Sequence, residues 1–446
     1  MDIEHIPQKK ILLPLDHARS GPIAAEFYEF LKTRAVGQPR IFKWCVETLE
    51  AVLQGFYPEK GPAASVLLVG PSGVGKTYIV RLLAEFLFGD PKGFTRVDGQ
   101  DISLEHEVSR IKGAPPGYKG YDDPPMITQK KLDLPAHRAI VQVTLQELGE
   151  QVRKEYVKIQ KERVGLMRHL AELSGMPKPD AQKQKDAQNK LEAIAKHLKE
   201  MGIPAYDRTK YDYISLLLLD EIERAHRDFH NLLFRVLDDG DLELEAKQEN
   251  GENASLDFSR TIIVATSNLG SEEITKMLRS SSGRSTGYHF KNQIYTPEEM
   301  DWEIYRECRE AVNKFFSTEF VNRFGDLVAA RPHSKENMFE ILDIEIEKLR
   351  ERLLDAGDLN FPITLHIDRS VKEYLVDEVS DRPEKGIRFL QQKLNARILR
   401  AISTLKSTEQ LHDGDTLHVS LDPSSKKLLF QKEEPVKLLE HIVVVE

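Results

Sequence analysis

The 446-residue chain has only two cysteines and no long apolar run. Cys45 and Cys308 are too few for a disulfide framework, and we expect both to be reduced thiols. No apolar stretch approaches the roughly 20 residues that a membrane-spanning helix needs. The first ten residues, MDIEHIPQKK, carry two acids, which is typical of neither a secretory leader nor an Arg-rich transit peptide. The sequence therefore predicts a cytoplasmic protein.

The chain also lacks an excess of basic residues. Its formal net charge of −9 argues against a chain-wide nucleic-acid surface, although a local basic patch stays open. Apolar residues make up 40% and charged residues 30%, as in soluble globular proteins. Because 446 residues exceed one ordinary core, we expect two or three packed units.

A glycine-rich segment lies between an apolar stretch at 65–70 and an amphipathic helical stretch that follows it. Glycines allow backbone N–H groups to surround phosphates, and the helix directs its positive end at the anion. A lysine at the end of such a loop reaches the β- and γ-phosphates, and the next hydroxyl suits a Mg²⁺ ion. The segment predicts a nucleotide-binding loop and reads Gly70, Pro71, Ser72, Gly73, Val74, Gly75, Lys76 and Thr77.

Polar residues end two further apolar strands. Asp220 and Glu221 follow the run at 214–219, where Asp220 would hold the Mg²⁺ shell and Glu221 would polarise the attacking water. Asn268 follows the run at 261–266 and could orient the same water. On its own, Asn268 is better explained as a turn former before Leu269 and Gly270.

These three strand ends, in this order, resemble the AAA+ superfamily. The segments between them resemble the C-terminal ATPase module of the Clp unfoldases and disaggregases, over roughly residues 25 to 430. The segments that carry the resemblance are GAPPGYKGY at 113–121, DEIERAH at 220–226, VLDDG at 236–240, TSNLGS at 266–271, FSTEFVNR at 316–323 and GIR at 386–388.

The resemblance implies an α/β fold with two parts. A P-loop domain with a parallel sheet flanked by helices would cover residues 21–332, after an N-terminal extension at 1–20. A small α/β lid would cover 333–432, with a helix at 334–355, a strand at 363–367, two helical stretches around 370–405 and strands near 416–420 and 427–431. Residues 433–446 would form a tail outside the family pattern.

The resemblance also assigns roles to residues that the strand ends do not contain. It places Arg323 on the γ-phosphate of a neighbouring subunit and Arg388 on the phosphates of its own subunit. Both roles suit a permanently charged guanidinium. Ile387 departs from the small residue usual in the family. Val36 would contact adenine, although a core valine at a helix start explains it nearly as well.

The segment Gly117, Tyr118, Lys119 and Gly120 looks like the family's axial pore loop. A tyrosine between glycines offers a mobile apolar plate that can hold an extended polypeptide without reading its sequence. Without the resemblance, an ordinary Pro/Gly turn with a packed tyrosine would be preferred. Lys119 stands where the family usually has a small apolar residue. A polar loop at 243–254 lies where the family has its second pore loop.

Residues of about 130–208 exceed the family pattern and predict a helical hairpin with one apolar seam. The apolar positions recur at helical spacing. They are Val141, Leu145, Leu148, Val152 and Ile159, then Ala187, Leu191, Ile194, Leu198 and Met201. Residues 151–200 hold twelve Lys or Arg against seven Asp or Glu. This arm either braces a ring or docks an adaptor or substrate.

These features predict an ATP-dependent protein unfoldase that uses ATP and Mg²⁺, works as a ring, expected to be hexameric, and threads polypeptide through its pore. Two alternatives remain. One is an ATPase subunit that feeds a separate protease, for which residues 284–290 are the candidate docking loop, with Thr286 in place of the first apolar residue. The other is an AAA+ scaffold or nucleic-acid remodeller.

Overall fold

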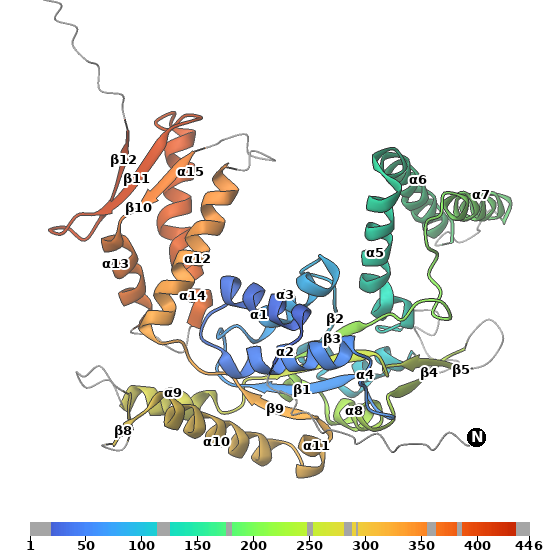
Figure 1. Cartoon of the computed structure of the whole chain (residues 1–446), viewed down its shortest axis with the longest axis horizontal. Coiled ribbons are helices and arrows are strands. Elements are labelled where there is room, and N and C mark those ends of the chain that lie inside the picture. The colour runs from blue at the N-terminus through green and yellow to red at the C-terminus, as the bar shows by residue number, and fades with distance from the viewer. Residues whose placement is uncertain are drawn as a thin grey trace, which may run out of the picture.

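A five-stranded parallel sheet lies at the centre of the larger part of the chain (Figure 1). The computed structural model describes residues 19–113, 125–174, 181–247, 253–280, 288–290, 293–354, 363–380 and 386–433. Neighbouring strands are parallel and follow the order β2-β3-β6-β1-β9. Their bounds are β1 Ala64–Val69, β2 Thr95–Asp98, β3 Ser215–Asp220, β6 Thr261–Ser267 and β9 Asp326–Ala329. The predicted fold class is confirmed.

Helices cover both faces of this sheet, which explains why its central strands are buried along their length and mostly apolar. Side chains alternate along β1: Val66 and Leu68 belong to one core, and Leu67 and Val69 to the other. The first core includes helices α1 Pro22–Arg34, α2 Pro39–Leu53 and α3 Lys76–Phe88. The second includes α4 Glu105–Lys112, α8 Arg227–Asp239, α10 Pro297–Phe315 and α11 Thr318–Arg323. Within the described ranges, every helix is too short or too polar to cross a bilayer.

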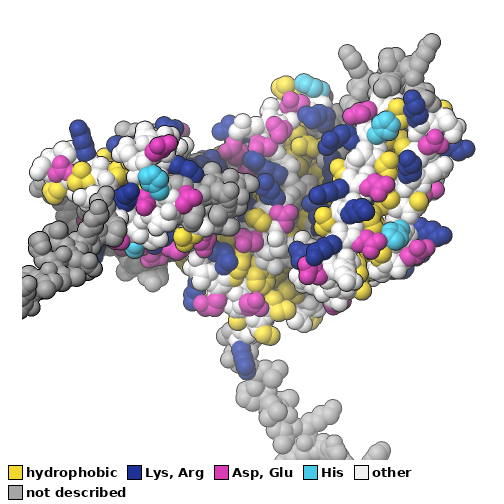
Figure 2. All heavy atoms as spheres, turned by 90° about the horizontal axis from the view of Figure 1, so that it is seen from above, with side chains coloured by type: hydrophobic (Ala, Val, Ile, Leu, Met, Phe, Trp, Pro, Cys, Tyr) yellow, Lys and Arg dark blue, Asp and Glu magenta, His cyan; other side chains and the backbone are white. Residues whose placement is uncertain are grey.

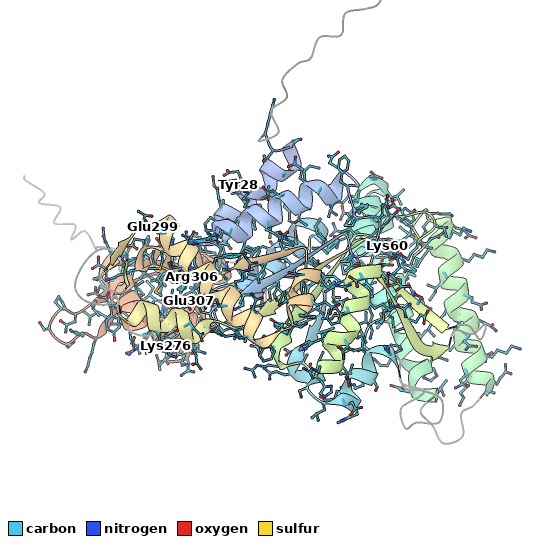
Figure 3. All side chains as sticks on the ribbon, turned by 90° about the horizontal axis from the view of Figure 1, so that it is seen from below. Tyr28, Lys60, Lys276, Glu299, Arg306 and Glu307 are labelled. Carbon is cyan, nitrogen blue, oxygen red and sulfur yellow. The ribbon has the colours of Figure 1, made fainter. Side chains whose placement is uncertain are left out.

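Smaller elements surround the sheet. The antiparallel hairpin of β4 (Asp241–Lys247) and β5 (Asn253–Asp257) occupies most of the region in which a polar loop was predicted. Helix α9 (Ser271–Ser280) leads to a second short hairpin, β7 (Tyr288–Phe290) with β8 (Gln293–Tyr295). The following helix, α10, carries a row of charges on its surface (Figure 3), where Arg306 pairs with Glu307 at 3.5 Å.

The C-terminal part has a separate core and contains the elements predicted for the lid. A three-stranded sheet of order β10-β11-β12 packs against four helices. The elements are α12 Lys335–Leu354, β10 Thr364–Ile367, α13 Arg369–Ser380, α14 Gly386–Leu394, α15 Arg400–Ser407, β11 Thr416–Leu421 and β12 Leu428–Lys432. One π-helical turn, Asn395–Leu399, joins α14 to α15.

In the described part of the inserted arm there are three helices, not the two that were predicted. They are α5 Gln129–Leu148, α6 Glu150–Ser174 and α7 Ala181–Glu200, and Figure 1 shows them on the side opposite the lid. Gly149 ends the first helix because its φ of 92° is not helical. An apolar seam does form, around Val141, Leu145, Ile159 and Leu198. Leu148, which was placed in that seam, is instead exposed.

A buried aspartate fastens the base of the arm to the body of the protein. Asp133 of α5 is fully buried and accepts hydrogen bonds from Tyr206 Oη at 2.7 Å and Gln129 Nε2 at 3.1 Å. Arg208 pairs with Asp133 at 3.0 Å and with Asp257, the last residue of β5, at 3.1 Å. The start of the arm, the segment that returns from it and the β4-β5 hairpin therefore share one polar cluster.

Candidate nucleotide site

The glycine-rich loop connects β1 to the first turn of α3. Gly70 has a φ of 141°, and a Cβ atom there would lie 2.5 Å from the carbonyl oxygen of Ala330. Gly75 has a φ of 99° immediately before α3 begins at Lys76. Both positions favour glycine because L side chains rarely adopt such angles. The loop therefore turns tightly and directs the N-terminus of α3 at the space beside it, as phosphate binding requires.

Lys76 is the buried cation of this loop. Its Nζ donates to the carbonyls of Gly70 at 2.7 Å and Pro71 at 2.8 Å, and to Asn268 Oδ1 at 3.0 Å. Only 7% of the residue is exposed. Burial lowers the pKa of Lys76 to about 8, against the opposing attraction of nearby carboxylates, of which Glu223 contributes most. The ammonium is thus poorly solvated and surrounded by acceptors.

Asp220 lies at the end of β3, beside the loop. Its Oδ1 accepts a hydrogen bond from Thr266 Oγ1 at 2.5 Å and one from Thr77 Oγ1 at 3.3 Å. Arg96 of β2 pairs with Oδ2 at 2.7 Å. The predicted Mg²⁺ ligands, Thr77 and Asp220, are therefore neighbours. Arg96 was not singled out from the sequence, because its partner is more than 120 residues away in the chain.

Glu221 is held by three side chains. Its φ of 54° is unusual for a residue with a Cβ atom and turns the chain sharply after β3. Oε1 accepts from Asn268 Nδ2 at 3.1 Å, and Oε2 accepts from Gln100 Nε2 at 2.8 Å and pairs with Arg224 at 2.8 Å. The backbone N–H of Glu221 donates to Thr266 Oγ1 at 3.0 Å.

Asn268 connects the buried cation to this acid, because its side chain contacts both Lys76 and Glu221. It also begins the turn into α9, since its carbonyl accepts from the N–H of Ser271 at 3.2 Å. The N–H of Asn268 donates to Glu223 Oε1 at 3.0 Å. The other oxygen of Glu223 is buried and has no partner in the described part of the chain. Sequence reasoning gave Glu223 no role.

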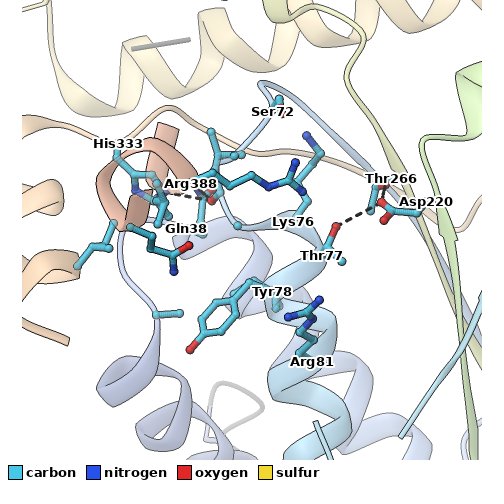
Figure 4. A pocket seen from close by; sticks show the side chains of 18 of the residues that line it. Gln38, Ser72, Lys76, Thr77, Tyr78, Arg81, Asp220, Thr266, His333 and Arg388 are labelled. Carbon is cyan, nitrogen blue, oxygen red and sulfur yellow. Dashed lines mark hydrogen bonds between the residues drawn. The ribbon is translucent and has the colours of Figure 1, made fainter. Parts of the chain in front are cut away.

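The lid closes the other side of the site, which encloses a cavity of about 390 Å³. The backbone N–H of Ile387 donates to the carbonyl of Gly73 at 3.0 Å, so the start of α14 contacts the loop directly. Arg388 lines the cavity and extends over the loop toward Lys76 (Figure 4). Val36 also lines the cavity and packs against the lid core, so it fits both explanations offered for it.

Polar side chains connect this loop to the start of the lid. The carbonyl of Val74 accepts from Gln38 Nε2 at 3.2 Å and contacts His333 Nε2 at 3.1 Å. Gln38 also donates to the carbonyl of Arg331 at 2.7 Å. Burial lowers the pKa of His333 to about 4, so the ring is neutral at physiological pH. The glycine-rich loop and the segment that leads into the lid at Arg331 and His333 are therefore joined by hydrogen bonds.

Arg323 is the one predicted phosphate-contacting side chain that lies away from this cavity. At the end of α11 it pairs with Asp238 and with Glu319, the latter at 3.1 Å, and lies 5.6 Å from the ring of Phe234. The predicted pore loop, Gly117 to Gly120, falls outside the described residues, as do residues 284–287 of the predicted docking loop and the tail from 434.

A P-loop before a helix, an acidic strand end beside it and a lid that contacts the loop define a P-loop nucleotide-binding module. The chain belongs to the AAA domain family (Cdc48 subfamily), whose model matches residues 61–142 and 178–327, and it is of the Clp type within the AAA+ ATPases. The model of the C-terminal D2-small domain of ClpB protein matches residues 334–419. The unmatched stretch between 142 and 178 lies in the arm.

Curated relatives match nearly the whole chain. The chaperone protein ClpB of Gloeobacter violaceus is 26% identical over 392 residues, which is 88% of this chain and 33% of that protein. Heat shock protein 100 of Trypanosoma brucei brucei is 28% identical over 404 residues, 90% of this chain and 34% of that protein. The ATP-dependent Clp protease ATP-binding subunit ClpC of Staphylococcus saprophyticus is 26% identical over 408 residues, 91% and 37%. The chain spans about a third of the length of these relatives.

A solved structure shares the fold. The closed state of Hsp104 with ATPγS and FITC casein matches with a TM-score of 0.58 and 21% identity, and covers 92% of this chain and 51% of that one. At this identity the match supports the fold alone.

Proposed function

We propose that the chain hydrolyses ATP with Mg²⁺ in the cavity between the sheet and the lid. The observation that carries this proposal is the continuous set of contacts from Lys76 through Asn268 to Glu221. Lys76 and Arg388 would neutralise the phosphates, and Glu221 would polarise water that Asn268 helps to position. The backbone of the glycine-rich loop, Gly70 to Gly75, would donate its N–H groups to the same phosphates.

The residues fit this ligand in size and chemistry. A volume of about 390 Å³ falls within the usual range of ligand sites, about 300–1,000 Å³. Thr77 and Asp220 supply hydroxyl and carboxylate oxygens, the donors that Mg²⁺ prefers, and Asp220 would act through water. The ion would supply charge neutralisation on the phosphates. Val36 would pack against the base, near Ile341 and Ile344 of the lid.

We further propose that subunits assemble into a ring, expected to be a hexamer. Arg323 supports this because it lies outside its own subunit's cavity, so any phosphate that it contacts would belong to a neighbouring subunit. Tyr118, with Gly117, Lys119 and Gly120, would line the pore and pull an unfolded or tagged polypeptide through it. Similarity to proteins named ClpB and heat shock protein 100 supports this substrate class.

The protease-coupled alternative keeps one supporting observation. A relative at 26% identity is named as the ATP-binding subunit of a Clp protease. An adaptor or protease partner and a cytoplasmic location remain predictions, and we do not expect nucleic acid to be the substrate.

Steady-state hydrolysis and nucleotide binding test the ATPase proposal. Lys76→Ala should lose both ATP binding and hydrolysis, because the buried cation of the loop is gone. Glu221→Gln should keep binding but lose hydrolysis by about 10²-fold or more, since a neutral amide cannot polarise water. Wild-type turnover by the Glu221→Gln protein would show that Glu221 is not the base.

A further inference from the structure

Three adjacent rows of side chains run along α6, and the first packs against the other helices of the arm. Heptad spacing places Val152, Tyr156, Ile159 and Leu173 in one row. Ile159 is 8% exposed and belongs to the seam with Val141 and Leu198. This row therefore accounts for how α6 packs against α5 and α7.

The second row is apolar but exposed. Val157, Val164 and Met167, with Gln160 among them, follow one another at spacings of three, four and three, which is also a heptad pattern. Their exposed fractions are 47% for Val157, 53% for Val164 and 52% for Met167. Arg163 and Leu166 continue the first row at the same heptad spacing. Val157, Val164 and Met167 each follow a position of that row by one residue, so the second row runs along the helix beside the seam. Within the described residues, no helix of this chain covers this second seam.

The third row is basic. Lys154, Lys158, Lys161 and Arg168 lie in this row at spacings of four, three and seven, and the same heptad row also holds Gly165 and, near the end of the helix, Glu172. Figure 2 shows Lys and Arg side chains over the arm, at the right of that view, interspersed with apolar and acidic ones. The row stands out because the whole chain has a net charge of −9. In coiled coils, charges beside an apolar seam select the partner.

We propose that this face of α6 binds an amphipathic helix of a partner protein that presents an apolar heptad row flanked by Asp or Glu. Charge complementarity selects this occupant, since the basic row would meet carboxylates. The α6 helix of a second copy is disfavoured, because antiparallel pairing would set each basic row against the other. Anchoring of the arm through Asp133 holds the face in place for such a partner.

The test uses the full chain and a fluorescein-labelled 28-residue helical peptide with Leu in the heptad row and Glu beside it. A second peptide carries Lys in place of Glu. Fluorescence anisotropy should show at least ten-fold tighter binding of the acidic peptide. Val164→Ser/Met167→Ser should weaken that binding at least ten-fold, whereas Val143→Ser, at a valine of α5 that is 55% exposed, should not.

Charge reversal provides the second arm of the test. Lys158→Glu/Lys161→Glu should exchange the preference, so that the Lys peptide binds more tightly, and Lys190→Glu/Lys196→Glu on α7 should keep the wild-type preference. Circular dichroism confirms that each variant keeps its helix content. The assay contains no ATP, so failure of the proposed ATPase would not affect it.

Three results would overturn the proposal. The first is equal binding of both peptides, or of neither. The second is self-association in sedimentation experiments that Val164→Ser/Met167→Ser abolishes, which would make a second copy the occupant. The third is binding of a labelled 20-mer DNA or RNA that depends on Lys158 and Lys161 but not on the apolar row.

Discussion

Lys76 holds its proton less firmly than a lysine in solvent does. Burial lowers its pKa to about 8, and the phosphates of a bound nucleotide would raise that pKa again. Below pH 8 the side chain is mostly a charged ammonium that can bind phosphate. Above pH 8 it is mostly a neutral amine, which must first take up a proton. The charge of this one side chain should therefore set how nucleotide affinity depends on pH.

We predict that ATP affinity falls about ten-fold between pH 7 and pH 9, because only about one site in ten remains protonated at pH 9. Isothermal titration calorimetry in buffers of different ionisation enthalpy would also detect proton uptake on binding near pH 8. The Lys76→Arg protein keeps its charge, so its weaker affinity should not change with pH. A wild-type affinity that is constant from pH 7 to pH 9 would contradict this account of Lys76.

At the scale of elements, the arm depends on one carboxylate at its base. Asp133→Ala would leave Tyr206, Gln129 and Arg208 without their shared acceptor. We expect a loss of about 2–4 kcal/mol in the free energy of unfolding, because buried polar partners would be left unpaired. Urea denaturation measures this loss. Glu162→Ala, at an exposed acid of α6, should change stability by less than about 0.5 kcal/mol. Equal effects of the two substitutions would show that the cluster does not anchor the arm.

The elements that the sequence predicted well are those with strong periodicity. The strands ending at Val69, Asp220 and Ser267 each contain a run of at least four apolar residues, and parallel pairing brings their carboxyl ends to one edge. The apolar residues before and after Gly149 keep the same helical spacing. The spacing therefore could not reveal that a helix ends at Gly149. Arg96 and Gln100 were missed for a different reason: only the folded sheet brings them to Asp220 and Glu221.

At the scale of the whole molecule, the position of Arg323 predicts that an active site needs two subunits. Glu221→Gln subunits supply an intact Arg323, and Arg323→Ala subunits supply an intact site. Equal mixing should restore ATP hydrolysis to at most about a quarter of wild type, the fraction of interfaces that combine both under random assembly.

The matched control mixes Glu221→Gln with Lys76→Ala subunits, which offer no intact site at any interface and should stay inactive. Light scattering in the presence of ATP follows assembly in both mixtures. A fully active monomer, or mixed rings that recover no activity, would remove Arg323 from the neighbour's site.

Substitution of Tyr118 tests whether ATP hydrolysis pulls polypeptide through a pore. ATP-driven unfolding of a tagged fluorescent protein is measured beside ATPase rates with and without unfolded casein. Tyr118→Ala should keep basal hydrolysis but lose unfolding and the stimulation by casein, whereas Tyr28→Ala, at an exposed tyrosine of α1, should keep all three. Stimulation by single-stranded DNA or RNA instead of unfolded protein, unchanged in Tyr118→Ala, would contradict the account.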